Sequence, residues 1–261
     1  MSGVEAQSDD ITPRQREIVR IVGENGFATI DALATHFAVS AQSIRRDIIQ
    51  LDRLGMLQRF HGGAGLRDTS VRLGYVEKHG RAAEGKARIG KAAAALVQPG
   101  ASVFLDVGTT AEAVALELRQ RGVGCRIFTV SLAVATILAG HDGTALHVFG
   151  GTSRGPDGSL VGAATVAAIG AIHFDCAFLG YSGFDEDGAL MDFDPDKIAV
   201  KQAALRRADM TVAVGDASKF LRQAVMRLAP VDDITRLVTD AAPPASLAAI
   251  FRDAGLVVSV A

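Results

Sequence analysis

The feature that most constrains this fold is a regular alternation of short apolar runs and helical segments from Lys86 to the end of the chain. Such alternation is typical of a parallel β-sheet whose strands are joined by helical crossovers. The sequence therefore predicts an α/β domain over residues 86–261. We expect strands at residues 101–105, 126–130, 145–149, 175–179, 211–214, 236–239 and 256–260, and helices at 87–96, 111–121, 132–139, 159–171, 195–208 and 244–254.

Glycine- and hydroxyl-bearing loops follow several of these strands, at residues 106–110, 130–131, 150–152 and 180–183. Ligands of open parallel sheets bind beyond the carboxyl ends of the strands, so we expect these loops to meet at one edge. In Gly108-Thr109-Thr110, the glycine lets the backbone approach a ligand, and the following helix offers free N–H groups. Taken alone, these three residues fit a capped helix start equally well. The presence of the other three loops at the same predicted edge favours a phosphate site.

Residues 12–64 follow a different pattern, three short helices and a hairpin. Thr12, Thr29 and Ser40 are placed to cap the three helices, and Pro13 suits a first helical position. The third helix, residues 41–54, carries an apolar stripe on one face and polar or basic side chains at its start. A glycine-rich hairpin, residues 55–63, follows it. This order predicts a winged helix-turn-helix.

A recognition helix presents the side chains of its first turns to the DNA major groove, where they reach base edges and phosphates. Two adjacent arginines on a helix are, by themselves, more often solvated surface charges, but the whole pattern favours DNA binding. Asp47 and Asp52 reduce the positive charge of this surface, and either one can pair with an arginine. The predicted DNA-contacting residues are Ser40, Gln42, Ser43, Arg45, Arg46, Arg59 and His61.

Composition limits the remaining possibilities. The chain has 27 Lys and Arg against 29 Asp and Glu, which gives a net charge of −2. This overall charge argues neither for nor against nucleic-acid binding. Cys125 and Cys176 form no metal-ligand spacing, and we expect reduced thiols with no metal and no cofactor. The polar start of the chain resembles no signal peptide, and no apolar run approaches the length of a membrane span. We therefore expect a cytoplasmic protein without a membrane partner.

The run IDALATHFAVSAQSIRRDIIQLDRLGMLQRFHGGA resembles the signature of the DeoR family of bacterial regulators. The segments LDVGTTAEAVALEL, VFGG, LVGAAT, FDCAFLGYSGFDEDGAL and VGDASKF resemble motifs of the family's effector domain, so the similarity covers residues 13–240. The resemblance implies an effector domain similar in fold to ribose-5-phosphate isomerase. It also implies a homodimeric or homotetrameric repressor of a sugar catabolic operon, which binds double-stranded operator DNA and a phosphorylated sugar.

Carried over by position, the resemblance assigns effector binding to Lys86, Asp106, Gly108, Thr109, Thr110, Ser131, Gly151, Lys201, Asp216 and Lys219. Three positions depart from the family pattern. Ser43 replaces a threonine and keeps the hydroxyl, whereas Val130 replaces an asparagine of the predicted pocket. Lys197 replaces a glutamate, and it either favours a more anionic effector or faces solvent. Within the family, residues 182–208 resemble regulators of glycerol-3-phosphate use and of sulfoquinovose catabolism.

The main alternative is a sugar-phosphate isomerase with an appended DNA-binding module. Isomerisation needs a carboxylate base, which the enzymes of this fold carry in an acidic strand end. Residues 179–184 contain no acid, and Asp185 and Glu186 are better explained by a turn that ends at Gly188. An RNA-binding protein is disfavoured because no aromatic platform accompanies the basic helix. We expect no catalytic residues, and three segments: a DNA-binding domain at 12–64, a linker at 65–85 and an effector domain at 86–261.

Overall fold

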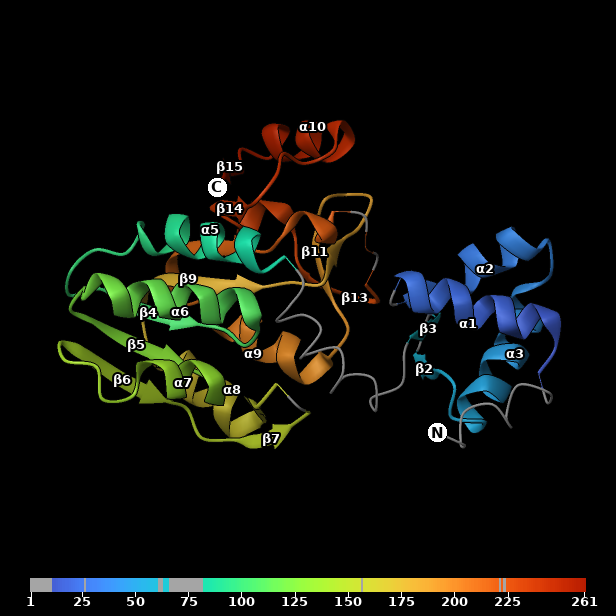
Figure 1. Ribbon diagram of the computed structural model, residues 1–261, viewed down its shortest axis with the longest axis horizontal. Helices are drawn as coiled ribbons and strands as arrows, with labels where there is room; N and C mark the ends of the chain where they lie inside the picture. The colour runs from blue at the N-terminus through green and yellow to red at the C-terminus, as the bar shows by residue number, and fades with distance from the viewer. Residues whose placement is uncertain are drawn as a thin grey trace. The chain divides into compact units, whose positions relative to one another are not determined.

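The computed structural model describes residues 11–25, 27–60, 63–65, 82–155, 157–220, 222 and 224–261 (Figure 1). The chain divides into two compact units, and the boundary between them falls between residues 65 and 82. His61 and residues 66–81 of the predicted linker lie outside the described residues. Each unit has its own apolar core, so each is considered by itself.

The N-terminal unit is a winged helix-turn-helix, as predicted. A three-stranded antiparallel sheet with the order β1-β3-β2 packs beside three helices. The strand β1 is absent from the sequence-based expectation because its three residues form a strand only by pairing with the distant β3. The elements are α1 (Pro13–Asn25), β1 (Phe27–Thr29), α2 (Ile30–Phe37), α3 (Ala41–Arg53), β2 (Gln58–Phe60) and β3 (Gly63–Gly65).

All three predicted helix caps are present. The Thr12 hydroxyl accepts a hydrogen bond from Gln15 N at 3.2 Å, and the Gln15 side chain accepts one from Thr12 N at 2.9 Å, which makes a reciprocal capping box. Thr29 accepts from Ala32 N at 3.1 Å, and Ser40 accepts from Ser43 N at 3.2 Å. The turn of the helix-turn-helix is therefore bounded by a cap that the sequence encodes locally.

The C-terminal unit contains a seven-stranded sheet with the order β15-β14-β12-β9-β4-β5-β6, in which every neighbouring pair is parallel (Figure 1). This confirms the predicted α/β class. The strands are β4 (Ser102–Leu105), β5 (Cys125–Thr129), β6 (Thr144–Val148), β9 (Phe174–Gly180), β12 (Ala208–Val214), β14 (Arg236–Thr239) and β15 (Val257–Val260).

Helices cover both faces of this sheet. On one face, α5 (Ala83–Ala94), α6 (Thr109–Arg121) and α7 (Leu132–Leu138) bury their apolar side chains against it. On the other face, α8 (Ala163–Gly170), α9 (Pro195–Leu205) and α10 (Ala245–Asp253) do the same. Along each buried strand, alternate side chains pack into the apolar cores on opposite faces of the sheet. Both sets are apolar, so each strand appears in the sequence as a continuous apolar run.

Two small antiparallel sheets are additions to the predicted fold. One joins β7 (Thr152–Arg154) to β8 (Ser159–Val161), and the other has the order β10-β11-β13. The helix expected at residues 159–171 is therefore wrong in its first turn, because Leu160 N instead donates to Val130 O at 2.8 Å. The strands of the second sheet are β10 (Gly183–Phe184), β11 (Leu190–Asp192) and β13 (Met226–Ala229).

The contact between α5 and α6 depends on Gly90, where a Cβ atom would lie 2.6 Å from Ala113 O. Gly90→Ala should lower the free energy of unfolding by about 1–3 kcal/mol because neither helix backbone has room to shift. Gly170→Ala in α8 is the matched control, since its Cβ would meet no described atom within 4 Å. This control should be stabilising by roughly 0.5 kcal/mol. Urea denaturation followed by circular dichroism measures both, and equal stability of the two variants would contradict the expected contact.

Candidate functional site

The carboxyl ends of the central strands bring together side chains that are far apart in the sequence. Asp106 follows β4, Gly180 ends β9, and Asp192 ends β11. Lys201 reaches them from the last turns of α9. Two of the loops predicted to share one edge of the sheet, at residues 106–110 and 180–183, therefore contribute to one polar cluster.

The ammonium group of Lys201 lies among three oxygen atoms. Its Nζ is 2.5 Å from Asp192 Oδ2 and 3.2 Å from Asp106 Oδ2, and it donates to Gly180 O at 2.7 Å. Asp106 Oδ2 also accepts from Gly180 N at 2.9 Å. All three charged side chains are buried, and the Lys201 residue is 4% exposed. A buried cation is stable only with such partners.

The charges of this cluster shift one another's ionisation. Burial would raise the pKa of Asp192, but the charge and hydrogen bond of Lys201 together outweigh burial and lower it. Burial raises the pKa of Asp106, and the attraction of Lys201 opposes that shift only in part. For Lys201, the two carboxylates overcome burial and raise its pKa. Lys201 and Asp192 are therefore a buried ion pair at neutral pH.

The Gly108-Thr109-Thr110 loop has the geometry expected for an anion site. Gly108 is the N-cap of α6 at a φ of 122°, a conformation that favours glycine, and no side chain caps the helix there. Thr109 is half-buried and Thr110 is buried. The first-turn N–H groups of α6, with their positive end of the helix dipole, are thus presented beside Asp106 and Val107.

The other effector residues suggested by the resemblance fall into two groups. Burial would raise the pKa of Asp216, but hydrogen bonds from Ser218 and the charges of Lys219 and Lys86 together lower it. The three effector residues among these gather at the ends of β12 and β14. Ser131 and Gly151 lie instead at the ends of β5 and β6.

Ser131 and Gly151 each have a structural role in this arrangement. The buried Ser131 hydroxyl caps α7 by accepting from Val134 N at 3.2 Å. A Cβ at Gly151 would lie 2.5 Å from the Thr165 hydroxyl, so glycine is needed for close packing there. Their resemblance-based role in effector binding stays a prediction.

The two departures that lie in the effector domain, Val130 and Lys197, have different surroundings. Val130 is 1% exposed and packs in the apolar cluster that contains Phe104 and Leu160, so its side chain is part of the core. Lys197 forms an ion pair with Asp157, with Nζ 2.5 Å from Oδ2 and both side chains 18% exposed. The Lys197 side chain is therefore mostly buried and paired instead of facing open solvent, and its influence on the charge of the effector stays a prediction.

Sequence reasoning gave no role to Asp192 of the polar cluster. It also gave none to three residues at the ends of neighbouring strands: Tyr181, Thr239 and Asp240. Asp192 stands in an otherwise apolar strand, and its isolation in the run ALMDF is the one signal that points to a buried partner. Asp240 accepts from Ala217 N at 2.7 Å. Tyr181 lies in the predicted loop 180–183, where nothing marks its hydroxyl as buried, and Thr239 has no signal because buried threonines are common in strands.

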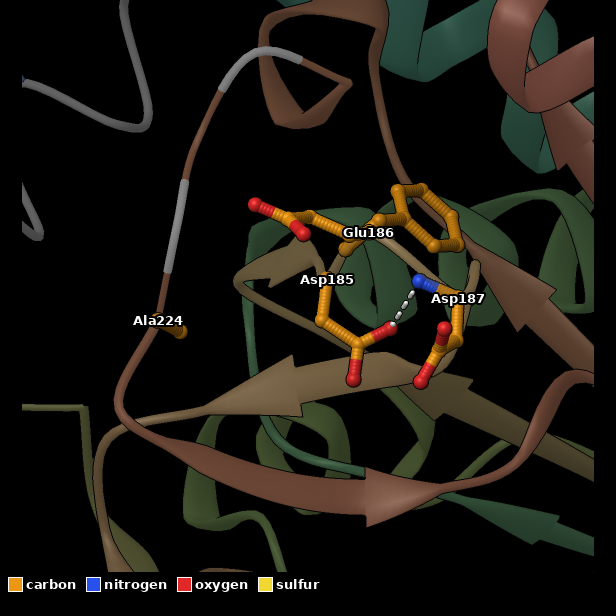
Figure 2. Close-up of a pocket in the computed structure, with 5 residues that line it drawn as sticks. Asp185, Glu186, Asp187 and Ala224 are labelled. Atoms are coloured by element: carbon orange, nitrogen blue, oxygen red, sulfur yellow. Dashed lines mark hydrogen bonds between the residues drawn. The ribbon is translucent and has the colours of Figure 1, made fainter.

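A pocket of about 330 Å³ lies elsewhere, beside the turn between β10 and β11, as Figure 2 shows. Asp185 Oδ1 accepts from Asp187 N at 3.0 Å and from Ala189 N at 2.8 Å, which confirms that this acid shapes the turn. Arg227 pairs with both Asp185 and Asp187. The acidic lining repels phosphate, so this pocket does not suit a phosphorylated ligand. The pocket is lined by Phe184, Asp185, Glu186, Asp187 and Ala224.

The N-terminal unit exposes the predicted DNA-contacting side chains on α3 and the wing. Gln42, Arg45 and Arg46 are exposed, as are Ser40 before the helix and Arg59 on β2. Ser43 is half-buried, with its hydroxyl 3.0 Å from that of Ser40. The first turns of α3 therefore present a polar and basic surface.

Each of the two acids of this surface has a hydrogen-bond partner outside α3. Asp47 is 6% exposed, and its carboxylate binds Arg14 Nε at 2.7 Å and the Gln15 amide at 3.1 Å, both from α1. Asp52 accepts a hydrogen bond from the backbone N of Arg59 at 3.3 Å. Asp47 thus pairs with an arginine, as sequence reasoning allowed, but with Arg14 of another helix.

Metal-binding clusters and membrane-spanning helices are both absent from the part of the chain that the structure describes. No cluster of three or more His, Cys, Asp or Glu side chains there is placed to hold a metal ion. No helix among those residues is both long and apolar enough to cross a bilayer.

Comparison with known proteins identifies both units. The DeoR-like helix-turn-helix domain matches residues 14–70, and the DeoR C-terminal sensor domain matches residues 81–241. The glycerol-3-phosphate regulon repressor of Escherichia coli (strain K12) is 34% identical over 93% of this chain and 96% of its own. The transcriptional repressor CsqR of the same strain is 32% identical over 92% of each chain. Ribose 5-phosphate isomerase A from Methanocaldococcus jannaschii aligns with a TM-score of 0.40 and 17% identity, over 53% of this chain and 54% of that one.

The fold and its two units are those of a DNA-binding transcriptional regulator with a sensor domain. The chain belongs to the DeoR family. Its relatives are transcriptional repressors, and the isomerase alternative is not favoured.

Replacing Lys201 tests the buried cluster. Lys201→Met leaves two buried carboxyl groups without a cation, which should lower the free energy of unfolding by about 3–5 kcal/mol at pH 7. Lys197→Met, which breaks the more accessible pair with Asp157, should cost only about 1 kcal/mol. Urea denaturation compares the two, and similar losses would show that the Lys201 cluster has no special weight.

The Lys201→Met variant should also reverse the way in which these carboxyl groups make the free energy of unfolding depend on pH. In the wild-type protein the pKa of Asp192 is lowered by folding, so its stabilising contribution is lost as pH falls through that lowered value. In Lys201→Met the cation no longer opposes burial, so the pKa of both carboxyl groups rises relative to wild type. The variant should therefore gain stability relative to wild type as pH falls from about 7 toward 5. Urea denaturation at these pH values measures the difference, and a constant difference would contradict it.

Proposed function

We propose that this protein represses a catabolic operon by binding operator DNA through α3 and the wing, and that a phosphorylated sugar or polyol controls this binding at the carboxyl edge of the sheet. The observation that carries the proposal is the uncapped N-terminus of α6 beside the buried Asp106–Lys201 cluster. The names of relatives add glycerol 3-phosphate to the effectors to be tried.

The roles within the effector site follow from charge. The N–H groups of α6 and the Thr109 and Thr110 hydroxyls suit a phosphate, since they are donors at the positive end of a helix dipole. Asp106 carries a carboxylate, which suits a hydroxyl group better than a phosphate oxygen. Lys86 and Lys219 supply cations at the ends of the neighbouring strands. The proposed site also includes Gly108, Ser131, Gly151, Lys201 and Asp216.

The control of DNA binding is a shift between two states of the protein. The effector must bind the state that is incompetent for DNA more tightly than the competent one, since equal affinities would move nothing. Helix-turn-helix regulators read paired half-sites, so we infer a homodimer or homotetramer. We also infer a cytoplasmic regulator without enzymatic activity, with DNA binding in residues 12–64, a linker at 65–85 and effector binding in 86–261.

DNA binding depends on α3 in this proposal. Arg45→Ala and Arg46→Ala should each weaken binding to DNA fragments selected by the wild-type protein by about tenfold or more, because each removes a contact to a base or a phosphate. Effector binding should be unchanged. Arg20→Ala is the control, since Arg20 lies on α1 and pairs with Glu17. Electrophoretic mobility shift or fluorescence anisotropy at moderate salt measures the affinities. Wild-type affinity of Arg46→Ala would refute the assignment of α3.

A thermal-shift screen tests the sensor. We expect sn-glycerol 3-phosphate, a sugar phosphate or a sulfosugar phosphate to raise the melting temperature, because a ligand that binds only the folded protein stabilises it. Thr109→Val should reduce that shift and leave operator affinity intact when no effector is present. A panel that produces no shift in the wild-type protein would refute the proposed effector class.

A further inference from the structure

Three buried polar atoms at the carboxyl edge of the sheet have no hydrogen-bond partner. In the part of the chain that the structure describes, the buried side-chain atoms without a partner are Asp106 Oδ1, Tyr181 OH, Thr239 Oγ1 and Arg236 Nε. Asp106 follows β4, Tyr181 follows β9, and Thr239 ends β14. Buried polar groups are nearly always paired, so their concentration at one edge asks for an explanation.

Tyr181 extends across the end of β12. A Cβ atom at Gly215 would lie 2.8 Å from two carbons of the Tyr181 ring and 2.9 Å from its hydroxyl oxygen. Glycine at this position is therefore what allows the ring to lie there. Burial, and then the charges of Asp216 and Asp240, raise the pKa of Tyr181. The hydroxyl is protonated at neutral pH and can both donate and accept a hydrogen bond.

Thr239 lies next to this hydroxyl in the order of the sheet. Val214 of β12 pairs with Val238 of β14, so the residues that follow, Gly215 and Thr239, are level with each other. Gly215 N also donates to Val238 O at 3.3 Å. Asp106 is linked to the same loop as Tyr181. Its other carboxylate oxygen, Oδ2, accepts a hydrogen bond from the backbone N of Gly180, the residue before Tyr181.

Packing alone does not account for these groups. An unpaired buried hydroxyl destabilises a protein relative to an apolar group of the same shape, so phenylalanine and valine would suit the folded state better. The strand ends are also where ligands of parallel sheets bind. None of the three groups is cationic, so they have no attraction for a phosphate, but each can bind a hydroxyl group.

We propose that the hydroxyls of Tyr181 and Thr239, with the free carboxylate oxygen of Asp106, bind hydroxyl groups of the effector and so select a phosphorylated polyol or sugar over simple phosphate. This inference rests on the proposed function, which supplies the phosphate end of the ligand at the N-terminus of α6. Enclosed polar groups of this kind discriminate strongly, because a ligand that lacks the matching hydroxyl leaves them unpaired.

The test uses Tyr181→Phe and Thr239→Val in the full-length protein, with sn-glycerol 3-phosphate, D-glucose 6-phosphate and inorganic phosphate as probes. Each variant should keep or raise the melting temperature without ligand, and should bind the best organic phosphate about tenfold more weakly. Binding of inorganic phosphate should not change. Calorimetric titration and thermal shift measure these quantities.

Thr211→Val provides the matched control. Thr211 is also a buried threonine of this sheet, but its hydroxyl donates to Asp233 O at 2.7 Å, away from the carboxyl edge. This variant should lower the melting temperature by about 2–4 °C and leave affinity for the organic phosphate unchanged.

The outcomes distinguish a failure of the proposed function from a failure of the selectivity inferred for Tyr181 and Thr239. If neither organic phosphate binds the wild-type protein, the proposed function fails. If one binds, and both Tyr181→Phe and Thr239→Val bind it as tightly as wild type, only the present inference fails. A lower melting temperature of these variants without ligand, together with unchanged affinity, would mean that a structural water satisfies the hydroxyls, which also overturns it.

Discussion

The C-terminal unit depends on one buried ammonium group. Lys201 of α9 joins the ends of β4 and β11 through Asp106 and Asp192, and it also binds the backbone oxygen of Gly180 in β9. Desolvating these charges is costly, so the cluster is stable only when all members are in place. It therefore fixes the relative positions of the strand ends that the effector loops follow.

The same sheet edge shows how stability and binding are divided. The charges of Lys201 and Asp192 are satisfied within the protein, whereas Asp106 keeps one oxygen without a partner. Glycine at position 108 permits the backbone φ of 122° at the start of α6, and glycine at position 215 leaves room for the Tyr181 ring. Groups that are fully paired stabilise the scaffold, whereas in our proposal the unpaired groups and the uncapped start of α6 bind the effector. Such local loss of stability is common at binding sites.

In the N-terminal unit, a polar network between α1 and α3 neutralises the charge of an acid on α3. Gln15 closes the capping box of α1, and its amide donates to Asp47 and, at 2.9 Å, to Gln50 of α3. Arg14 neutralises the remaining charge of Asp47. The acid beside the two arginines of the recognition helix is thus paired with another helix, and the basic surface of α3 keeps its charge for DNA.

The sequence by itself determined the elements and the family. Period and capping residues are local, so the winged helix-turn-helix, the strands of the parallel sheet and the caps at Thr12, Thr29 and Ser40 were predictable to within a few residues. The Gly108 loop was predictable too, because a glycine at a strand-to-helix turn has few uses. Tertiary structure alone decided the partners: which arginine Asp47 pairs with, that Lys197 meets Asp157, and that Val130 packs in the core. These depend on contacts between segments distant in the chain, which no local pattern encodes.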